Sequence, residues 1–162
     1  MPAILFVCTA NQFRSPIAAA CFLRKLTILG IQSDWKVGSA GIWGTPGLTA
    51  HPKAVEAAKE IGLDISKHRT RLINVNLVNS ADVIAVMESR HKDAIEADFP
   101  QARERIVLLG KLSKVFAGEI TDPAQDKFTQ SEVAARMINT CIDQAFTKLV
   151  QFAEAHQIQQ KI

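Results

Sequence analysis

The chain has 162 residues, of which 48% are apolar and 22% are charged, and this is the composition of an ordinary globular protein. These values exclude the disordered, collagen-like and disulfide-scaffold classes, and the length favours one compact domain. The 19 basic and 16 acidic residues leave a net charge of +3. Because the basic residues are scattered, we expect no nucleic acid and no membrane surface as a partner, whereas a small anion is compatible with this charge.

Three cysteines, Cys8, Cys21 and Cys141, show no CxxC or Cys/His ligand spacing. Their number and spacing argue against a disulfide framework or a zinc site and favour a reducing compartment. We expect Cys21 and Cys141 to be buried by packing. The first apolar run, residues 3–7, is too short for a signal-peptide core, and no stretch approaches the roughly 18 apolar residues of a membrane span. The sequence therefore predicts a cytoplasmic protein.

Short apolar runs alternate with segments of helical periodicity along the chain. The run at residues 3–7 is uninterrupted, as expected for a central strand buried on both faces of a parallel sheet. Ser15 and Pro16 supply a cap residue and a proline for the helix that follows. Further strands are predicted at 35–40, 81–87 and 105–109, and further helices at 52–61, at 89–97 and from residue 131 onward.

This alternation predicts an α/β fold with a doubly wound parallel sheet of about four strands and helices on both faces. We expect one domain over residues 1–156 and a short polar tail over residues 157–162. Ligands of such sheets bind beyond the carboxyl ends of the strands, so the turn after Val7 is the first candidate site. The last helix shows one apolar face, formed by Ala134, Met137, Ile138, Cys141, Ala145, Leu149 and Phe152.

The turn after the first strand places a cysteine at the strand end and an arginine six residues later. Such a loop, curling into a helix, directs backbone N–H groups inward and forms a nest for a phosphate-sized anion. The Arg14 guanidinium can hold two phosphate oxygens, and the same positive field stabilises a Cys8 thiolate, which is a nucleophile for in-line attack. The predicted phosphate-binding residues are Thr9, Ala10, Asn11, Gln12, Phe13 and Arg14.

The pattern C-x5-R-S-P at this turn resembles that of the low-molecular-weight protein tyrosine phosphatases. Ser39-Ala40-Gly41, Gly62–Ser66 with His68-Arg69, and Asp122-Pro123 also occur in the order found in that family. The resemblance implies a phosphomonoester hydrolase that acts on phosphorylated proteins, with phosphotyrosine as the main expectation. It also implies a cysteinyl-phosphate intermediate, inorganic phosphate as the product, and no metal ion or cofactor.

The resemblance assigns chemical roles by position. Cys8 matches the nucleophile, and Asp122 matches the acid that protonates the leaving oxygen and then activates water. Arg14, with the loop amides, matches the group that stabilises the equatorial phosphate oxygens. On sequence alone, an aspartate before a proline is more commonly an ordinary turn residue, and it is the other matches that favour the catalytic role.

Four further residues match supporting positions of the family. Ser15 matches a hydroxyl that hydrogen-bonds the thiolate, although it also fits the role of a helix cap. Asn11, Ser39 and His68 match a hydrogen-bond network that fixes the conformation of the loop. The alternative for His68 is a partly exposed histidine in a basic stretch. We predict a solvated edge for the neighbouring cations Lys67, Arg69 and Arg71. We predict exposure to solvent for the remaining histidines, His51, His91 and His156.

The loop departs from the family pattern at three positions. Ala10 replaces a frequent glycine and would be strained if its φ were positive, Gln12 replaces a small aliphatic residue or threonine, and Phe13 replaces a second cysteine. After Asp122-Pro123 the family's aromatic residues are also missing. We assign the substrate wall to Phe13, Trp43 and Gln125, with core packing as the alternative for the two aromatic residues.

Three other functions compete with hydrolysis. A thiol-linked arsenate reductase has the same fold, but it needs further cysteines placed to relay a disulfide. A phosphotransfer carrier that only holds phosphate on Cys8 would not need Asp122. A non-catalytic module that binds phosphorylated proteins is the third alternative, and phosphoarginine or small phosphoesters remain alternative substrates.

Overall fold

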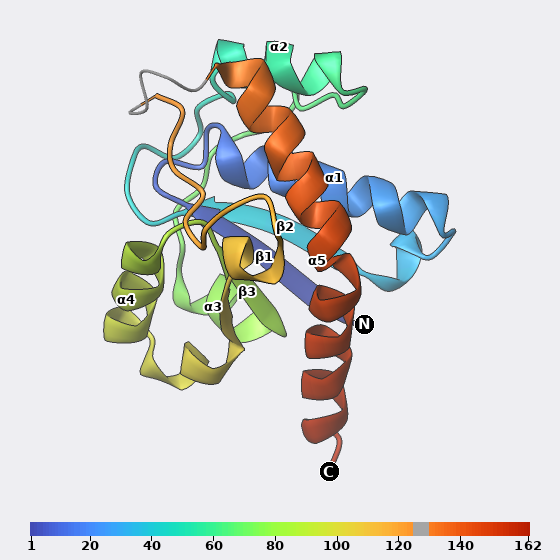
Figure 1. The fold of residues 1–162 in the computed structure, drawn as a ribbon. Coiled ribbons are helices and arrows are strands. Elements are labelled where there is room, and N and C mark those ends of the chain that lie inside the picture. The colour runs from blue at the N-terminus through green and yellow to red at the C-terminus, as the bar shows by residue number, and fades with distance from the viewer. Residues whose placement is uncertain (125–129) are drawn as a thin grey trace.

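The computed structural model describes residues 1–124 and 130–162. In this part of the chain a four-stranded parallel sheet, with strand order β2-β1-β3-β4, lies between helices (Figure 1). The strands are β1 (Ala3–Cys8), β2 (Lys36–Gly41), β3 (Val83–Val86) and β4 (Ile106–Leu108). The α-helices are α1 (Arg14–Ile28), α2 (Pro52–Glu60), α3 (Val75–Ser80), α4 (Ser89–Asp98) and α5 (Ser131–Gln159).

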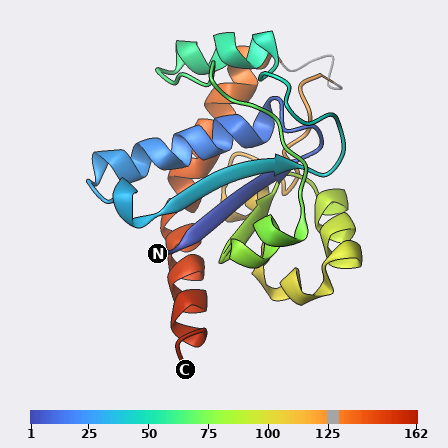
Figure 2. The same ribbon diagram turned by 180° about the vertical axis from the view of Figure 1, so that it is seen from behind.

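Strand β1 is interior to the sheet and is buried along its whole length. It pairs in parallel with β2, where Cys8 is opposite Gly41, and with β3, where Val7 is opposite Val86. Side chains of β1 alternate between two apolar cores: Phe6 packs in the core that contains α1 and α5, and Leu5 packs in the core that contains α3 and α4. The helices therefore cover both faces of the sheet, which confirms the predicted doubly wound fold (Figures 1 and 2).

The beginning of α1 differs from the prediction. The N-cap residue is Phe13, which forms no side-chain cap, so the interpretation of Ser15 as the helix cap was wrong. The Ser15 side chain is instead fully buried and contacts Cys8 and Asn11. Helix α3 was not predicted, although its N-cap Asn74 accepts a hydrogen bond from the Leu77 N–H, an ordinary helix-start signal.

Helix α5 continues to Gln159, so the expected tail of residues 157–162 begins inside the helix. Two of its last residues, His156 and Gln157, hydrogen-bond the buried carboxylate of Asp82 beside the start of β3. The prediction that His156 faces solvent was therefore wrong. Phe152, expected on the apolar face of this helix, is 47% exposed. None of the described helices has the length and apolarity needed to cross a membrane.

Aromatic rings fix α1 against the sheet and α5. The ring centroid of Phe22 lies 5.7 Å from that of Phe6 on β1, 5.5 Å from that of Trp35 and 5.0 Å from that of Phe146 on α5. Phe22 is completely buried, and its tilted contacts are of the kind that aromatic pairs prefer. This cluster holds the helix that begins at the end of the first turn.

We predict that Phe22→Ala lowers the free energy of unfolding by about 3 to 5 kcal/mol, because it removes buried area and leaves a cavity among three rings. The neighbouring substitution Leu23→Ala is the control, since Leu23 is exposed on the same helix and should change stability by about 0.5 kcal/mol or less. Urea denaturation of both variants measures the difference. Equal losses in the two variants would contradict this account of the core.

Candidate active site

A cavity of about 600 Å³ opens at the carboxyl end of β1. It lies where the first turn, the beginning of α2 and the beginning of α5 meet, which is the edge of the sheet that the topology predicted. Its lining includes Cys8, Ala10, Gln12, Phe13, Arg14, His51, Lys53, Glu56, Asp122, Pro123, Ala124 and Glu132.

Cys8 is buried at the base of this cavity, and its Sγ lies 2.9 Å from Ser15 Oγ. Backbone hydrogen bonds from Ile42 and Trp43 to the carbonyls of Cys8 and Thr9 hold the start of the turn against the chain that follows β2. A side chain at Gly41 would not fit there, because its Cβ would lie 2.8 Å from the Thr9 carbonyl oxygen.

Asn11 has a φ of 59° and is the one non-glycine residue with positive φ in the part of the chain that the structure describes. Ala10 is therefore not at the strained position. The Asn11 side-chain amide donates to Ser15 Oγ and Ser39 Oγ, each at 2.9 Å. Asparagine tolerates this left-handed conformation better than most residues, and the buried side chain fixes it here.

Two residues of the segment after α2 complete the contacts to Asn11. His68 Nε2 lies 2.7 Å from the Asn11 carbonyl oxygen, so this ring nitrogen is the donor. The Arg71 backbone N–H donates to Asn11 Oδ1 at 3.0 Å, and its side-chain Nε donates to the Ser39 carbonyl. The structure thus brings together the three residues that were predicted to support the loop, Asn11, Ser39 and His68.

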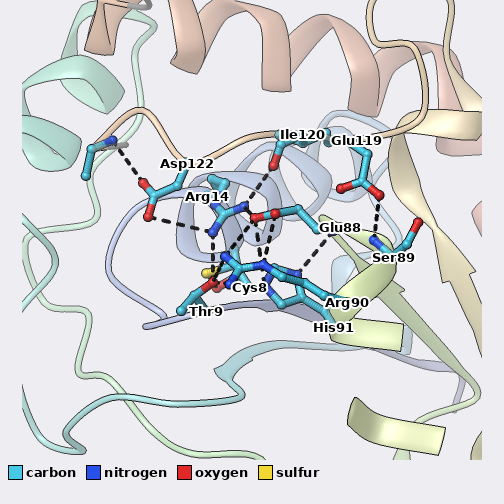
Figure 3. A network of polar contacts seen from close by, with 12 residues as sticks. Cys8, Thr9, Arg14, Glu88, Ser89, Arg90, His91, Glu119, Ile120 and Asp122 are labelled. Carbon is cyan, nitrogen blue, oxygen red and sulfur yellow. Dashed lines mark hydrogen bonds and ion pairs between the residues drawn. The ribbon is translucent and has the colours of Figure 1, made fainter. Parts of the chain in front are cut away.

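Arg14 is 2% exposed and is fixed from several sides (Figure 3). Its Nη1 donates to the Glu88 carboxylate and, at 2.8 Å, to the Ile120 carbonyl. Its Nη2 donates to Thr9 Oγ1 at 3.1 Å and lies 3.8 Å from Asp122 Oδ2. The guanidinium therefore lies between the first turn and Asp122.

The Asp122 side chain is 21% exposed and lines the same cavity as Cys8. Its Oδ1 accepts a hydrogen bond from the Ala124 N–H at 3.0 Å, as an ordinary turn aspartate does. Asp122 makes both contacts at once, because Oδ1 accepts the hydrogen bond of the turn and Oδ2 lies toward Arg14. Asp122 therefore forms the turn expected of an aspartate before a proline, and its role as general acid stays a prediction.

Glu88, Arg90 and His91, at the beginning of α4, were not predicted as part of the site. His91 Nδ1 accepts a hydrogen bond from the Glu88 N–H at 3.1 Å, so the neutral ring carries its proton on Nε2, which lies 2.9 Å from Thr9 Oγ1. Arg90 donates to Thr9 Oγ1 at 3.0 Å and to the Glu88 carboxylate. The sequence signal that could have revealed this group is a polar run directly after a buried strand adjacent to β1.

Burial governs the charge of this group. His91 is inaccessible to solvent, so the prediction of an exposed His91 was wrong. Burial lowers its pKa to about 4, and the positive charges of Arg14 and Arg90 act in the same direction. Burial raises the pKa of Glu88, but hydrogen bonds from Arg90 and Arg14 outweigh it and hold that pKa below its usual range. The group thus consists of a neutral imidazole, an ionised carboxylate and two guanidinium groups.

The residues assigned to the substrate wall are not all placed together. Phe13 lines the cavity. Trp43 is 47% exposed and contacts the Arg90 guanidinium, 5.7 Å from the ring centroid, outside the set of described residues that line the cavity. Gln125 lies outside the described residues.

His51 is exposed at the cavity, which confirms the prediction of its exposure. It caps α2 through Nδ1, which accepts a hydrogen bond from the Lys53 N–H.

Cys21 and Cys141 are buried away from this cavity, which confirms the prediction that they are packed in the core. Burial raises the pKa of Cys21 to about 12 and also raises that of Cys141. Neither thiol has the exposed, electropositive surroundings of a reactive thiolate.

A model of the family described as low molecular weight phosphotyrosine protein phosphatase matches residues 3–161. The chain belongs to this family. The probable low molecular weight protein-tyrosine-phosphatase EpsP of Ralstonia nicotianae is 36% identical over 140 residues, which cover 86% of this chain and 90% of that protein. A protein-arginine-phosphatase of Geobacillus stearothermophilus is 33% identical over 146 residues, which cover 90% of this chain and 95% of that protein.

The solved structure of a low molecular weight protein tyrosine phosphatase from T. tengcongensis has the same fold. Its TM-score is 0.82 at 31% sequence identity, and the match covers 92% of this chain and all of that one. An arsenate reductase of Staphylococcus haemolyticus is 40% identical, but over 87 residues, 52% of this chain and 58% of that protein. The phosphatase family is therefore matched over nearly the whole chain, and the arsenate reductase over about half.

We predict that acid weakens the protein through His91. In the unfolded chain the His91 imidazole binds a proton below about pH 6.5, whereas in the folded protein it does so only near its pKa of about 4. The contribution of the neutral imidazole to the free energy of unfolding is therefore full above about pH 6.5 and is lost as the pH falls toward 4. The loss is at most about 3 kcal/mol. The thermal midpoint between about pH 7 and about pH 4.5 should fall less steeply in His91→Asn than in the parent protein.

His51→Asn is the matched control, because His51 is exposed and asparagine also caps a helix. Its thermal midpoint should follow that of the parent protein at every pH. The same dependence of the thermal midpoint on pH in the parent and in His91→Asn would show that the pKa of this imidazole does not differ between the folded and the unfolded protein.

Proposed function

We propose that this protein hydrolyses phosphotyrosine in phosphorylated proteins, with Cys8 as the nucleophile and inorganic phosphate as the product. The observation that carries the proposal is that Cys8, Arg14 and Asp122 line one cavity, with the thiol at its base and the aspartate beside the arginine. The free cysteines support a cytoplasmic setting for this activity.

In the first step, the Cys8 thiolate attacks the phosphorus atom, so an S–P bond forms while the ester P–O bond breaks. Asp122 gives its proton to the leaving phenolic oxygen. Arg14 and the N–H groups of residues 9–14 stabilise the equatorial oxygens. For this the Nη2 of Arg14 turns from Thr9 to the phosphate, while Nη1 stays on Glu88.

In the second step, water attacks the phosphorus atom of the cysteinyl phosphate and the S–P bond breaks. The Asp122 carboxylate, now deprotonated, takes the proton of the water. Ser15, whose Oγ lies 2.9 Å from Cys8 Sγ, donates a hydrogen bond to the departing thiolate. The side chains restore their starting protonation states, and phosphate leaves through the mouth of the cavity.

Phosphoarginine is a second candidate substrate, and a specific feature of the cavity favours it. The carboxylates of Glu56 and Glu132 line the mouth, against one lysine, Lys53, and would attract the cationic guanidinium of the leaving group. For an aryl ester, Phe13 supplies the apolar wall. Rates of hydrolysis for a phosphotyrosine peptide and a phosphoarginine peptide of matched sequence distinguish the two substrates.

Arsenate reduction receives less support from the same site. It requires Cys8 to bond to arsenic and a second thiolate to attack the Cys8 sulfur, so that a disulfide forms while the S–As bond breaks and arsenite leaves. Cys21 and Cys141 are buried, and burial raises the pKa of both. Cys21 lies within α1 and Cys141 lies within α5, and neither lines the cavity that contains Cys8, so hydrolysis agrees better with the structure.

We predict that Cys8→Ser abolishes hydrolysis of p-nitrophenyl phosphate and keeps binding of orthovanadate, because the backbone amides and Arg14 remain. Cys21→Ala is the control, since it removes a buried thiol outside the cavity and should keep turnover. Initial rates and a vanadate titration measure the two effects. Turnover by Cys8→Ser at the parental rate would overturn the assignment of the nucleophile.

We predict that Asp122→Asn lowers kcat by about 10²- to 10⁴-fold, because the proton donor is lost while the hydrogen bond from the Ala124 N–H is kept. The loss should be larger for phenyl phosphate than for p-nitrophenyl phosphate, whose leaving group needs less protonation. Asp143→Asn on α5 is the control and should retain the parental rate. An equal loss for the two esters would contradict the role of general acid.

A further inference from the structure

A second cavity, of about 390 Å³, lies between α1, β2 and the segment that joins α2 to α3. In Figure 2 this segment (green) passes the carboxyl end of β2. None of the described residues lines both this cavity and the one that contains Cys8. Its polar lining consists of Ser39, Asp64, Lys67, His68, Arg69 and Arg71, and we call it the basic groove.

The basic groove carries an excess of positive charge. Two arginines, one lysine and a histidine share the lining with one carboxylate, that of Asp64. Like several other cations of the described residues, Lys67, Arg69 and Arg71 form no ion pair within 4.0 Å. What sets these three apart is that they line one cavity together. The predicted solvated edge is therefore a concave surface on which the positive charge is not neutralised by close ion pairs.

Backbone carbonyls orient the two arginines of the groove. Arg71 Nε donates to the Ser39 carbonyl at 2.8 Å, and its Nη2 lies over Gly38, so close that a Cβ there would be 2.5 Å away. Arg69 Nη1 donates to the His68 carbonyl at 2.9 Å. A carbonyl positions a guanidinium without cancelling its charge, and each arginine has five N–H donors, so several donors remain for an anion.

We infer that the basic groove binds a small oligophosphate chain. Three cations against one carboxylate match an anion with several charges better than a monoanion, and guanidinium groups hold phosphate oxygens through paired hydrogen bonds. A free inorganic polyphosphate and the triphosphate of a nucleotide share this chemistry. This site is additional to the loop that contains Cys8, and it does not depend on the proposed hydrolysis.

The groove is linked to the phosphate loop through Asn11. His68 and Arg71, which line the groove, are also the residues whose N–H groups bind the carbonyl and the side chain of Asn11. An anion in the groove therefore acts on the contacts that hold the loop without entering the cavity that contains Cys8. It should change kcat for p-nitrophenyl phosphate, whereas an anion in the active site competes with the substrate and raises KM.

The experiment measures the binding of inorganic tripolyphosphate by isothermal titration calorimetry while orthovanadate saturates the loop that contains Cys8. The parent protein is compared with Lys67→Gln/Arg69→Gln, since these exposed side chains line the groove and were given no role in the hydrolysis. The control, Arg103→Gln/Lys148→Gln, removes the same charge from exposed positions outside the groove. A parallel arm replaces tripolyphosphate by ATP.

We expect one tripolyphosphate per protein, an affinity at least about tenfold lower in Lys67→Gln/Arg69→Gln, and an unchanged affinity in the control. Equal affinity for ATP assigns recognition to the phosphate chain, and tighter binding of ATP indicates an additional contact to the nucleoside. Both results support the binding of oligophosphate in the basic groove. The absence of saturable binding, or an equal loss in the two double variants, overturns it. Binding that raises only KM and leaves kcat unchanged overturns the link through Asn11.

Discussion

The left-handed backbone of Asn11 is the constraint on which the site depends. A phosphate-sized nest forms only if the chain after Cys8 reverses within a few residues, and that reversal needs one residue with positive φ. The conformation costs energy for any residue with a side chain, so it persists only where the surroundings enforce it. Here Ser15 and Ser39 hold the side chain, and the segment after α2 binds both the side chain and the carbonyl.

The parallel pairing of β1 with two neighbours explains why the loop is held from both sides. The strand β2, opposite Cys8 at Gly41, brings Ser39 to Asn11, while β3, opposite Val7 at Val86, brings the beginning of α4 to Arg14. On the α4 side, N–H groups of Arg14, Arg90 and His91 all approach the Thr9 hydroxyl, which has only two acceptor lone pairs. Three donors compete for these two lone pairs, so the proposed turn of Arg14 toward a phosphate would leave one donor for each lone pair.

The sequence predicted those parts of the site that a local pattern encodes. Short apolar runs, of which only residues 3–7 are uninterrupted, predicted the strands, and the spacing of Cys8 and Arg14 predicted the loop, because these features depend on neighbours in the chain. The exposure predicted for His91 was wrong because its partner, Thr9, comes from another element. Ser15 lies beside Cys8 as the resemblance implied, and only the prediction that it caps the helix was wrong. From sequence alone, a polar residue after a strand is predicted to be exposed to solvent, and only the topology shows which elements cover it.

In the proposed function, reaction and substrate choice belong to different parts of this molecule. The residues proposed to bind phosphate come from the loop after β1, and every buried side-chain N or O atom among the described residues has a hydrogen-bond partner. The mouth is formed instead by the beginnings of α2 and α5, whose side chains Lys53, Glu56 and Glu132 are at least partly exposed. Exposed side chains can be replaced at little cost in stability. One phosphate loop can therefore serve different leaving groups. This agrees with the names of two relatives of this chain, one a probable protein-tyrosine-phosphatase and the other a protein-arginine-phosphatase.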